Sequence, residues 1–226
     1  MAPGFIGENF MSISKWSISV FKNIDKKTNY RMGNIIRTLT NTNTRGFWNK
    51  KLSSYGGRWR DFTYKYILEF LPENFSFSLL DIGCALGDGC VLLKSHFPEA
   101  DISGADFSEA GIEKAKKKSD EVSFFMLDIS KKNPPRKYDY ITLIHTLEHF
   151  NNPYPIVDKC LKFVDRALII QVPYVEQFDS PYLYSRCTHR YLFNEKTFSG
   201  YNCKILKITE YINIAGYRYI IYGLSP

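Results

Sequence analysis

The chain has 226 residues and a mass of 26.3 kDa, and 44% of its residues are hydrophobic and 16% aromatic. This composition excludes a mostly disordered chain, and no apolar run approaches the ~18 residues of a membrane-spanning helix. The first residues do not resemble a secretory signal, and the five cysteines contain no CxxC pair that would suggest a zinc knuckle or a disulfide framework. We therefore expect a soluble, cytoplasmic protein.

Positive charge is concentrated near the N-terminus. Residues 1–60 contain 11 Lys and Arg and two acids, whereas the whole chain has a net charge of only +7. A basic segment beside a near-neutral body can attract nucleic acid, phosphate-bearing sugars or lipid headgroups. Because the basic residues are scattered among Asn, Thr and Ser, we favour a solvated arm, and a nucleic-acid partner is the less favoured alternative.

The N-terminal part of the chain is expected to hold an arm followed by two helices. Residues 1–30 show little periodicity, and apolar residues recur at helical spacing over 31–39. A longer helix is expected over 58–71, where an aromatic residue occupies every fourth position and Pro72 follows the end. Residues 48–59 are expected to form a lid. Two adjacent glycines would act as its hinge, and its tryptophans would lie over a bound cofactor when the lid closes.

From residue 77 onwards, short apolar runs alternate with amphipathic segments, which indicates a parallel sheet with helices on both faces. Helices are expected over 88–96, over 108–118, from Pro153 onwards and over 194–201, with a long loop over 173–193. The last two strands have no room between them for a crossover helix, so they are expected to pair antiparallel. The seven expected strands are 77–82, 101–105, 122–127, 138–144, 166–172, 205–211 and 217–224.

The turn after the first of these strands has the pattern D-x-G-x-A-x-G, from Asp81 to Gly87. Glycines there let a ligand lie against the backbone, and the start of the next helix offers unpaired N–H groups. The pattern resembles motif I of the class I S-adenosylmethionine-dependent methyltransferases, with alanine in place of the middle glycine. We expect this alanine to have a negative φ. The resemblance implies cofactor contacts from Asp81, Gly83, Cys84, Ala85 and Gly87, and from His145 after the fourth strand.

Two further strands end in acids that extend the resemblance, which covers residues 79–223. Asp106 follows the second strand, where a carboxylate can accept hydrogen bonds from both ribose hydroxyls. Asp128 follows the third strand, where the family holds the adenine amino group. Phe107 and Ile129 are their expected companions. The resemblance implies a Rossmann-like α/β sandwich over 58–226, with residues 1–57 as a basic arm and lid.

The segment after the fourth strand carries the candidate chemistry, because His145, Glu148 and His149 lie where the transferable methyl is expected. HTLEH resembles the E-x-x-E-H segment of ubiquinone-pathway and small-RNA methyltransferases, in which acids and histidines hold a divalent metal. That resemblance implies a metal site formed by His145, Glu148, His149 and His189. The alternative has no metal: Glu148 and His149 fix the loop, and His145 acts alone as the base.

These features favour a methyltransferase that uses S-adenosylmethionine to modify a small-molecule acceptor, namely a hydroxyl of a sugar or secondary metabolite. The aromatic residues of the loop over 173–193 either border the acceptor pocket or belong to the core. Two other classes remain: an RNA 2′-O-methyltransferase with a divalent metal, and an idle cofactor-binding partner subunit. Nothing in the pattern indicates the oligomeric state.

Overall fold

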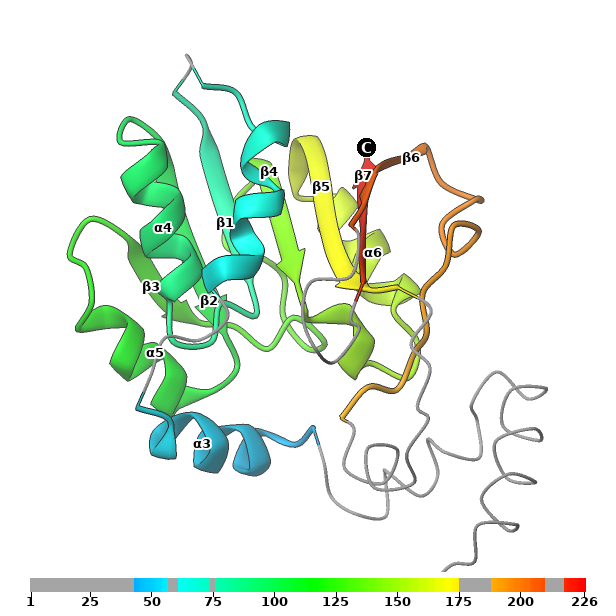
Figure 1. Ribbon diagram of the computed structural model, residues 1–226. Helices are drawn as coiled ribbons and strands as arrows, with labels where there is room; N and C mark the ends of the chain where they lie inside the picture. Colours follow the sequence, from blue (N-terminus) through cyan, green and yellow to red (C-terminus); the bar gives the residue numbers. More distant parts are fainter. Residues whose placement is uncertain (1–42, 57–60, 74–75, 175–187, 210–217) are drawn as a thin grey trace, which may run out of the picture.

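The computed structural model describes residues 43–56, 61–73, 76–174, 188–209 and 218–226, which form a seven-stranded sheet with helices on both sides (Figure 1). The helix expected over 31–39 and the arm lie outside the described residues. So do residue 57 of the expected hinge, most of the loop over 173–193, and the connection between the last two strands. Among the described residues, no helix is long and apolar enough to cross a bilayer.

The strands follow the order β3-β2-β1-β4-β5-β7-β6. Strands β1 to β5 are parallel where they pair, and β7 is antiparallel to both β5 and β6. The expected mixed sheet with an antiparallel C-terminal pair is therefore confirmed. The strand bounds are β1 Ser78–Ile82, β2 Asp101–Asp106, β3 Ser123–Met126, β4 Tyr138–Ile144, β5 Val164–Pro173, β6 Cys203–Ile208 and β7 Tyr219–Leu224.

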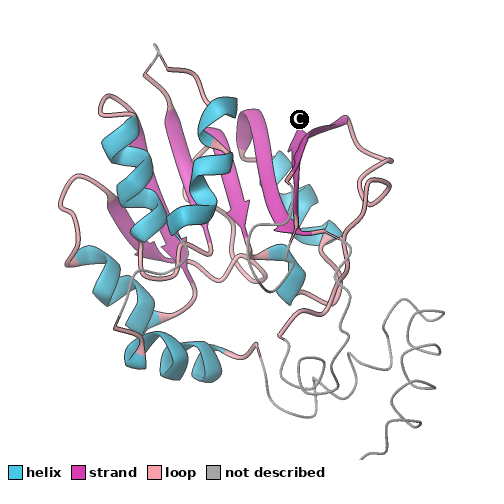
Figure 2. Ribbon diagram, in the orientation of Figure 1, coloured by secondary structure: helices cyan, strands magenta, loops and turns pink. Residues whose placement is uncertain are grey.

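Helices cover the two faces of the sheet, and one further helix lies across its end (Figure 2). The core on one face includes residues of α4 (Asp88–His96) and α5 (Glu109–Lys116), and the core on the other includes residues of α6 (Tyr154–Leu161). Helix α3 (Arg45–Ser54) lies beyond the carboxyl ends of the strands, next to α5 (Figure 1). The expected boundary between arm and catalytic domain at residue 57 stays a prediction.

Two helix starts follow directly from residue type. The Ser108 hydroxyl caps α5 by accepting a hydrogen bond from the Gly111 N–H at 3.2 Å, as its position before an acidic first turn predicts. Pro153 directly precedes α6, where its fixed φ and missing N–H cost nothing. Both helices then bury one apolar face against the sheet.

The single helix expected over 58–71 was wrong. The described residues form two short 3₁₀ helices instead, η1 (Asp61–Tyr66) and η2 (Leu68–Phe70). Aromatic and β-branched residues are weak α-helix formers. The side chains buried in the core are also not the aromatic residues at every fourth position that we expected to be buried. Tyr64, Ile67 and Leu71 are buried, whereas Tyr66 and Phe70 are only half-buried.

The helix expected over 194–201 was also wrong, because this segment forms consecutive turns. The Thr197 N–H donates to the Asn194 carbonyl at 3.0 Å, and the bonds at Ser199 and Tyr201 have the same three-residue spacing. The Asn194 side chain accepts from the Lys196 N–H at 2.9 Å, which offers the backbone an alternative to a helix. Phe198 is buried here against the face covered by α6.

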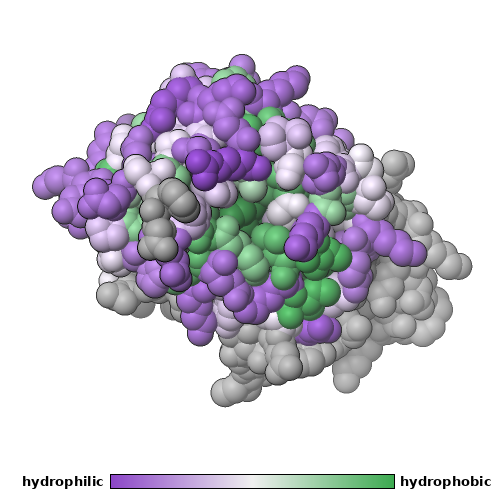
Figure 3. Space-filling view, turned by 90° about the horizontal axis from the view of Figure 1, so that it is seen from above, coloured by the Kyte–Doolittle hydropathy of each residue, from purple (hydrophilic) through white to green (hydrophobic). Residues whose placement is uncertain are grey.

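Seen from above, at the end of the sheet opposite α3, the described surface is mainly hydrophilic at its rim, and hydrophobic residues gather in a hollow near its middle (Figure 3). The parallel strands begin at this end, whereas β7 ends here. The glycine turn after β1, the acids at or after the ends of β2 and β3 and the segment after β4 lie at the other end, because each comes at the carboxyl end of a parallel strand. The two ends of the sheet therefore differ in chemistry as well as in position.

Candidate active site

A cavity of about 520 Å³ lies at the carboxyl ends of β1, β2 and β4. Many of the expected site residues line it, whereas Asp81, Gly87, Glu148 and His189 do not. The expected residues that line the cavity are Gly83, Cys84, Ala85, Asp106, Phe107, Asp128, Ile129, His145 and His149. Sequence reasoning missed other lining residues, which include Asn43, Arg45, Tyr64, Lys131, Thr146 and Arg190.

The turn after β1 is shaped by two glycines with left-handed backbones, Gly83 (φ 86°) and Gly87 (φ 77°). A Cβ at Gly83 would overlap the side chain of Thr146, and one at Gly87 would overlap Phe124 and Ala115. The Gly83 N–H also donates to the carbonyl of Ala105 on the neighbouring strand, at 2.7 Å. The turn therefore needs glycine at both positions for backbone conformation and for close packing.

Ala85 does not have the negative φ that we expected. Its φ is 50°, in the left-handed region that is costly for residues with a Cβ. Its N–H donates to Oδ2 of Asp106 at 3.0 Å, and this bond between neighbouring strand ends holds the conformation. Ala85 thus adopts a backbone conformation that is typical of glycine, and this conformation is strained for a residue with a Cβ.

We expect Ala85→Gly to change the free energy of unfolding by less than about 0.5 kcal/mol, because relief of left-handed strain offsets the entropy of the more flexible glycine and the lost methyl group. Ala100→Gly is the matched control, since Ala100 is buried but has no positive φ. It should lose about 1 kcal/mol or more. Denaturant titration measures both variants, and equal losses would contradict strain at Ala85.

Asp81, expected to contact the cofactor, instead lies fully buried beneath the turn. Its carboxylate accepts hydrogen bonds from the Tyr64 hydroxyl at 2.6 Å and the Thr142 hydroxyl at 2.7 Å. Burial raises the pKa of Asp81, while the hydrogen bonds from Tyr64, Thr142 and Cys90 act in the opposite direction. The geometry makes Asp81 a buried acceptor that joins the end of β1, directly before the turn, to η1 and β4.

Tyr64→Phe should lower the free energy of unfolding by about 2 kcal/mol, because it removes a donor from a buried carboxylate. For a chain of this size, that corresponds to a fall in melting temperature of about 4–8 °C. Tyr66→Phe serves as the control, since its hydroxyl is not among the donors to Asp81. If both variants melt at the same temperature as the unaltered protein, Tyr64 does not stabilise the turn through Asp81.

Asp106 and Asp128 both face the cavity, but their environments differ. The Asp106 carboxylate is buried and accepts from the Ser108 N–H at 2.8 Å as well as from Ala85. Burial raises its pKa to about 6, although these N–H groups pull the pKa down. Asp128 is more exposed and pairs with Lys131 at 3.3 Å and Arg45 at 3.7 Å, and its pKa is lowered because hydrogen bonds and charge outweigh its partial burial.

The segment after β4 begins with a strained residue. His145 has φ 53°, a left-handed conformation that is strained for a residue with a side chain, and its N–H donates to the carbonyl of Gln171 on the neighbouring strand at 2.8 Å. Its Nδ1 lies 3.2 Å from Oε1 of Glu148. Burial alone would raise the pKa of Glu148, but the hydrogen bond from His145 and the charges of three histidines lower it to about 2. Glu148 is thus a buried carboxylate beneath an imidazole cluster.

The ligand atoms of Glu148, His149 and His189 lie within 4.8 Å of one another. His145, the fourth expected ligand, is not part of this group and contacts Glu148 instead. Oε2 of Glu148 is buried and has no hydrogen-bond partner among the described residues. The His149 Nδ1 lies 3.2 Å from the carbonyl of Thr188, which can only accept, so this nitrogen is the donor, and in the neutral ring the lone pair is on Nε2. The donors present therefore fit a divalent cation.

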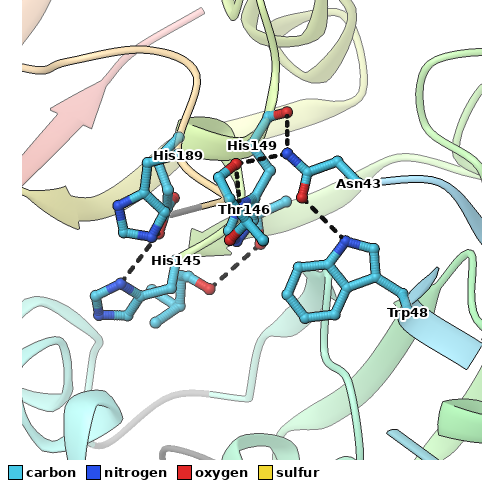
Figure 4. Close-up of polar contacts among 9 residues, drawn as sticks. Asn43, Trp48, His145, Thr146, His149 and His189 are labelled. Carbon is cyan, nitrogen blue, oxygen red and sulfur yellow. Dashed lines mark hydrogen bonds and ion pairs between the residues drawn. The ribbon is translucent and has the colours of Figure 1, made fainter. Parts of the chain in front are cut away.

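The end of the cavity beside His149 is assembled from segments that are far apart in the chain. Asn43 and Trp48 approach His149 from the N-terminal side, and His189 approaches from the segment before Tyr191 (Figure 4). The described aromatic residues of the expected loop do not line the cavity. Phe193 is in the core, and the Tyr191 hydroxyl bonds to that of Tyr154 at 2.8 Å, so for these residues the core interpretation holds.

This strand order, with a glycine turn after β1 and acids after β2 and β3, defines the class I methyltransferase fold. The family model described as "Methyltransferase domain" matches residues 45–200, and the chain belongs to this family. Over 101 residues it is 37% identical to malonyl-[acyl-carrier protein] O-methyltransferase of Priestia megaterium, which covers 42% of this chain and 37% of the relative. It is also 30% identical over 112 residues to demethylmenaquinone methyltransferase of Thermotoga maritima, which covers 48% of this chain and 46% of the relative.

A solved structure with a similar fold is magnesium protoporphyrin IX methyltransferase of Synechocystis with bound S-adenosylhomocysteine. It has a TM-score of 0.61 and 18% identity, and the match covers 85% of this chain and 99% of that one. The expected fold class and family are thereby confirmed. The chain spans less than half the length of the curated relatives it matches.

Proposed function

We propose that this protein transfers a methyl group from S-adenosylmethionine to an oxygen of a small molecule, namely a hydroxyl of a sugar or secondary metabolite. One observation carries the proposal: the glycine turn, the acids Asp106 and Asp128 and the imidazoles of His145 and His149 all line one cavity. Methyl transfer from a sulfonium develops little new charge, so alignment and removal of the acceptor proton account for most of the rate.

In this proposal Asp106 binds the ribose and Asp128 the adenine, with Phe107 and Ile129 as the walls of the nucleoside end. The acceptor proton goes to a histidine at the other end. His149 suits this role because its Nδ1 is committed to the Thr188 carbonyl, which leaves Nε2 as a base. Glu148 orients His145 through a hydrogen bond of 3.2 Å. The names of the relatives support a small acceptor group, since they name trans-aconitate, demethylmenaquinone and a malonyl group on an acyl-carrier protein.

The experiment that tests the proposal is calorimetric titration with S-adenosylhomocysteine between pH 5 and 7.5. Ribose hydroxyls stabilise the ionised carboxylate, and the pKa of Asp106 in the cofactor-free protein is about 6. Binding should therefore release a proton near pH 6, and the affinity should fall about tenfold at pH 5.

Two variants control this titration. Asp106→Asn should bind weakly because a neutral amide accepts weaker hydrogen bonds than a carboxylate, and its affinity should not change with pH because it has no proton to release. Asp165→Asn should behave as the unaltered protein, because Asp165 is an exposed surface residue paired with Lys137. No binding by the unaltered protein would refute the proposed function, and pH-independent binding would refute the ribose assignment alone.

As the alternative to a base role for His149, we propose that Glu148, His149 and His189 hold a divalent cation at the acceptor end, because one Nε2 cannot both take up the acceptor proton and bind the ion. Two imidazoles and one carboxylate favour a borderline metal such as Zn²⁺, Fe²⁺ or Mn²⁺ over Mg²⁺. Such an ion would supply Lewis-acid activation of an acceptor oxygen. The support is the buried carboxylate oxygen of Glu148 that has no donor among the described residues, together with the proximity of the three ligand atoms.

His189→Ala should weaken binding of Mn²⁺ or Zn²⁺ alone by more than tenfold, because it removes one of three ligands. His96→Ala is the matched control, as His96 is exposed on α4 and distant in sequence from the cluster. Calorimetry and metal analysis of the purified protein measure stoichiometry and affinity without any acceptor. Equal affinities of the two variants would show that the cluster is a hydrogen-bonded group and not a metal site.

A further inference from the structure

The side chain of Asn43 joins three segments at the acceptor end of the cavity. Its Nδ2 donates to the carbonyls of His149 at 3.2 Å and Thr188 at 2.5 Å, and its Oδ1 accepts from the indole N–H of Trp48 at 3.3 Å (Figure 4). Both amide hydrogens thus have an acceptor, and the amide oxygen has a donor. One short side chain holds α3, the end of η3 (Leu147–His149) and the segment that carries His189.

The chemistry of these contacts restricts this position to asparagine. A carbonyl can only accept and an indole N–H can only donate, so the orientation of the amide is fixed by its neighbours. An aspartate would place a negative oxygen against two carbonyls. The backbone of Asn43 has φ 64°, a left-handed conformation that asparagine adopts more readily than most other residues with a side chain. Conformation and hydrogen bonding therefore select the same residue type.

The helix that Asn43 holds is also fastened at its other end. Lys114 of α5 donates from Nζ to the carbonyls of Leu52, Ser53 and Tyr55 at 2.7–2.9 Å, which satisfies the last turn of α3. Between these two points, Trp48 and Leu52 line the cavity. The Trp48 ring also meets the His149 ring edge-on, with centroids 5.1 Å apart. Helix α3 is therefore a strap across the cavity, fixed at the acceptor end by Asn43 and at the other end by Lys114.

We propose that Asn43 is a positioning residue that couples the strap to the acceptor-side histidines His149 and His189. The strap, which would cover the bound cofactor, and the histidines that face the acceptor are therefore ordered together. Its amide fixes the carbonyl of Thr188, and this same carbonyl holds the His149 imidazole. Release of the strap would therefore also loosen the ring that faces the acceptor. The part of this proposal that concerns cofactor retention rests on the proposed function.

Three variants and three readouts test the coupling. Asn43→Gly keeps the left-handed backbone and removes the side-chain amide. Asn43→Asp keeps the size of the side chain but replaces the donating NH₂ group with an accepting oxygen. Lys114→Met frees only the other end of α3. Hydrogen exchange in the cofactor-free protein reports the amides of 45–54 and 188–191 separately. We expect both asparagine variants to exchange about tenfold faster in both segments, as the loss of two or three hydrogen bonds implies. Lys114→Met should affect 45–54 alone.

The second readout is the rate of S-adenosylhomocysteine release, measured by stopped-flow fluorescence. It should rise about tenfold in Asn43→Gly and Asn43→Asp, since the strap opens more often. Ser53→Ala is the control, because its exposed hydroxyl bonds only within α3, to the Lys50 carbonyl at 2.9 Å. The indole N–H resonance of Trp48, assigned with Trp48→Phe, should shift in Asn43→Gly and stay in place in Ser53→Ala.

The outcomes separate the coupling from the cofactor assignment. Faster exchange in 45–54 without any change in 188–191 for both asparagine variants would overturn the coupling, and unchanged exchange in both segments would do the same. If the unaltered protein does not bind S-adenosylhomocysteine, the proposed function fails, and the exchange experiment still decides whether Asn43 joins the two segments. Faster exchange in both segments supports the proposal in either case.

Discussion

The position of β1 between β2 and β4 determines where the glycine turn, the acids Asp106 and Asp128 and the segment after β4 lie. The chain runs outward from β1 to β2 and β3 on one side, then returns to add β4 and β5 on the other side. All of these strands are parallel, so their carboxyl ends lie at one edge, and the connections after β1 and β4 leave the sheet side by side. Gly83 consequently lies against Thr146, although 63 positions separate them, and the Thr146 hydroxyl bonds to the Ile82 carbonyl at 3.1 Å.

Much of this arrangement is predictable from sequence because it depends on local patterns. Strand and helix alternation, the Ser108 cap and the glycine turn involve residues close together in the chain, and all of these features were recovered. The errors at 58–71 and 194–201 arose where tertiary contacts overrode helical spacing. Tyr64 turns toward a buried carboxylate on another element, and Phe198 turns into the core, so neither segment keeps the period of an α-helix.

The sign of φ at Ala85 was mispredicted for a similar reason. Residue type alone favours a negative φ, but the tight turn and the bond to Asp106 require the left-handed region. Asn43 could not have been identified from its neighbours in sequence, since its partners lie 106 and 145 positions away. Composition marked the surrounding segment only as rich in polar residues. Residues whose role depends on long-range hydrogen bonds carry no local periodic signal.

The two ends of the cavity are built by different means. At the end that we propose binds the nucleoside, backbone N–H groups and acids at the ends of adjacent strands form the walls, so the shape of this end follows from the sheet itself. At the other end, side chains come from α3, from the segment after β4 and from the segment before Tyr191, none of which belongs to a strand. Loops change more readily than strands without loss of the fold. The first end can therefore stay constant while the second varies, and the hydrogen bonds of Asn43 join the three segments that form the second end.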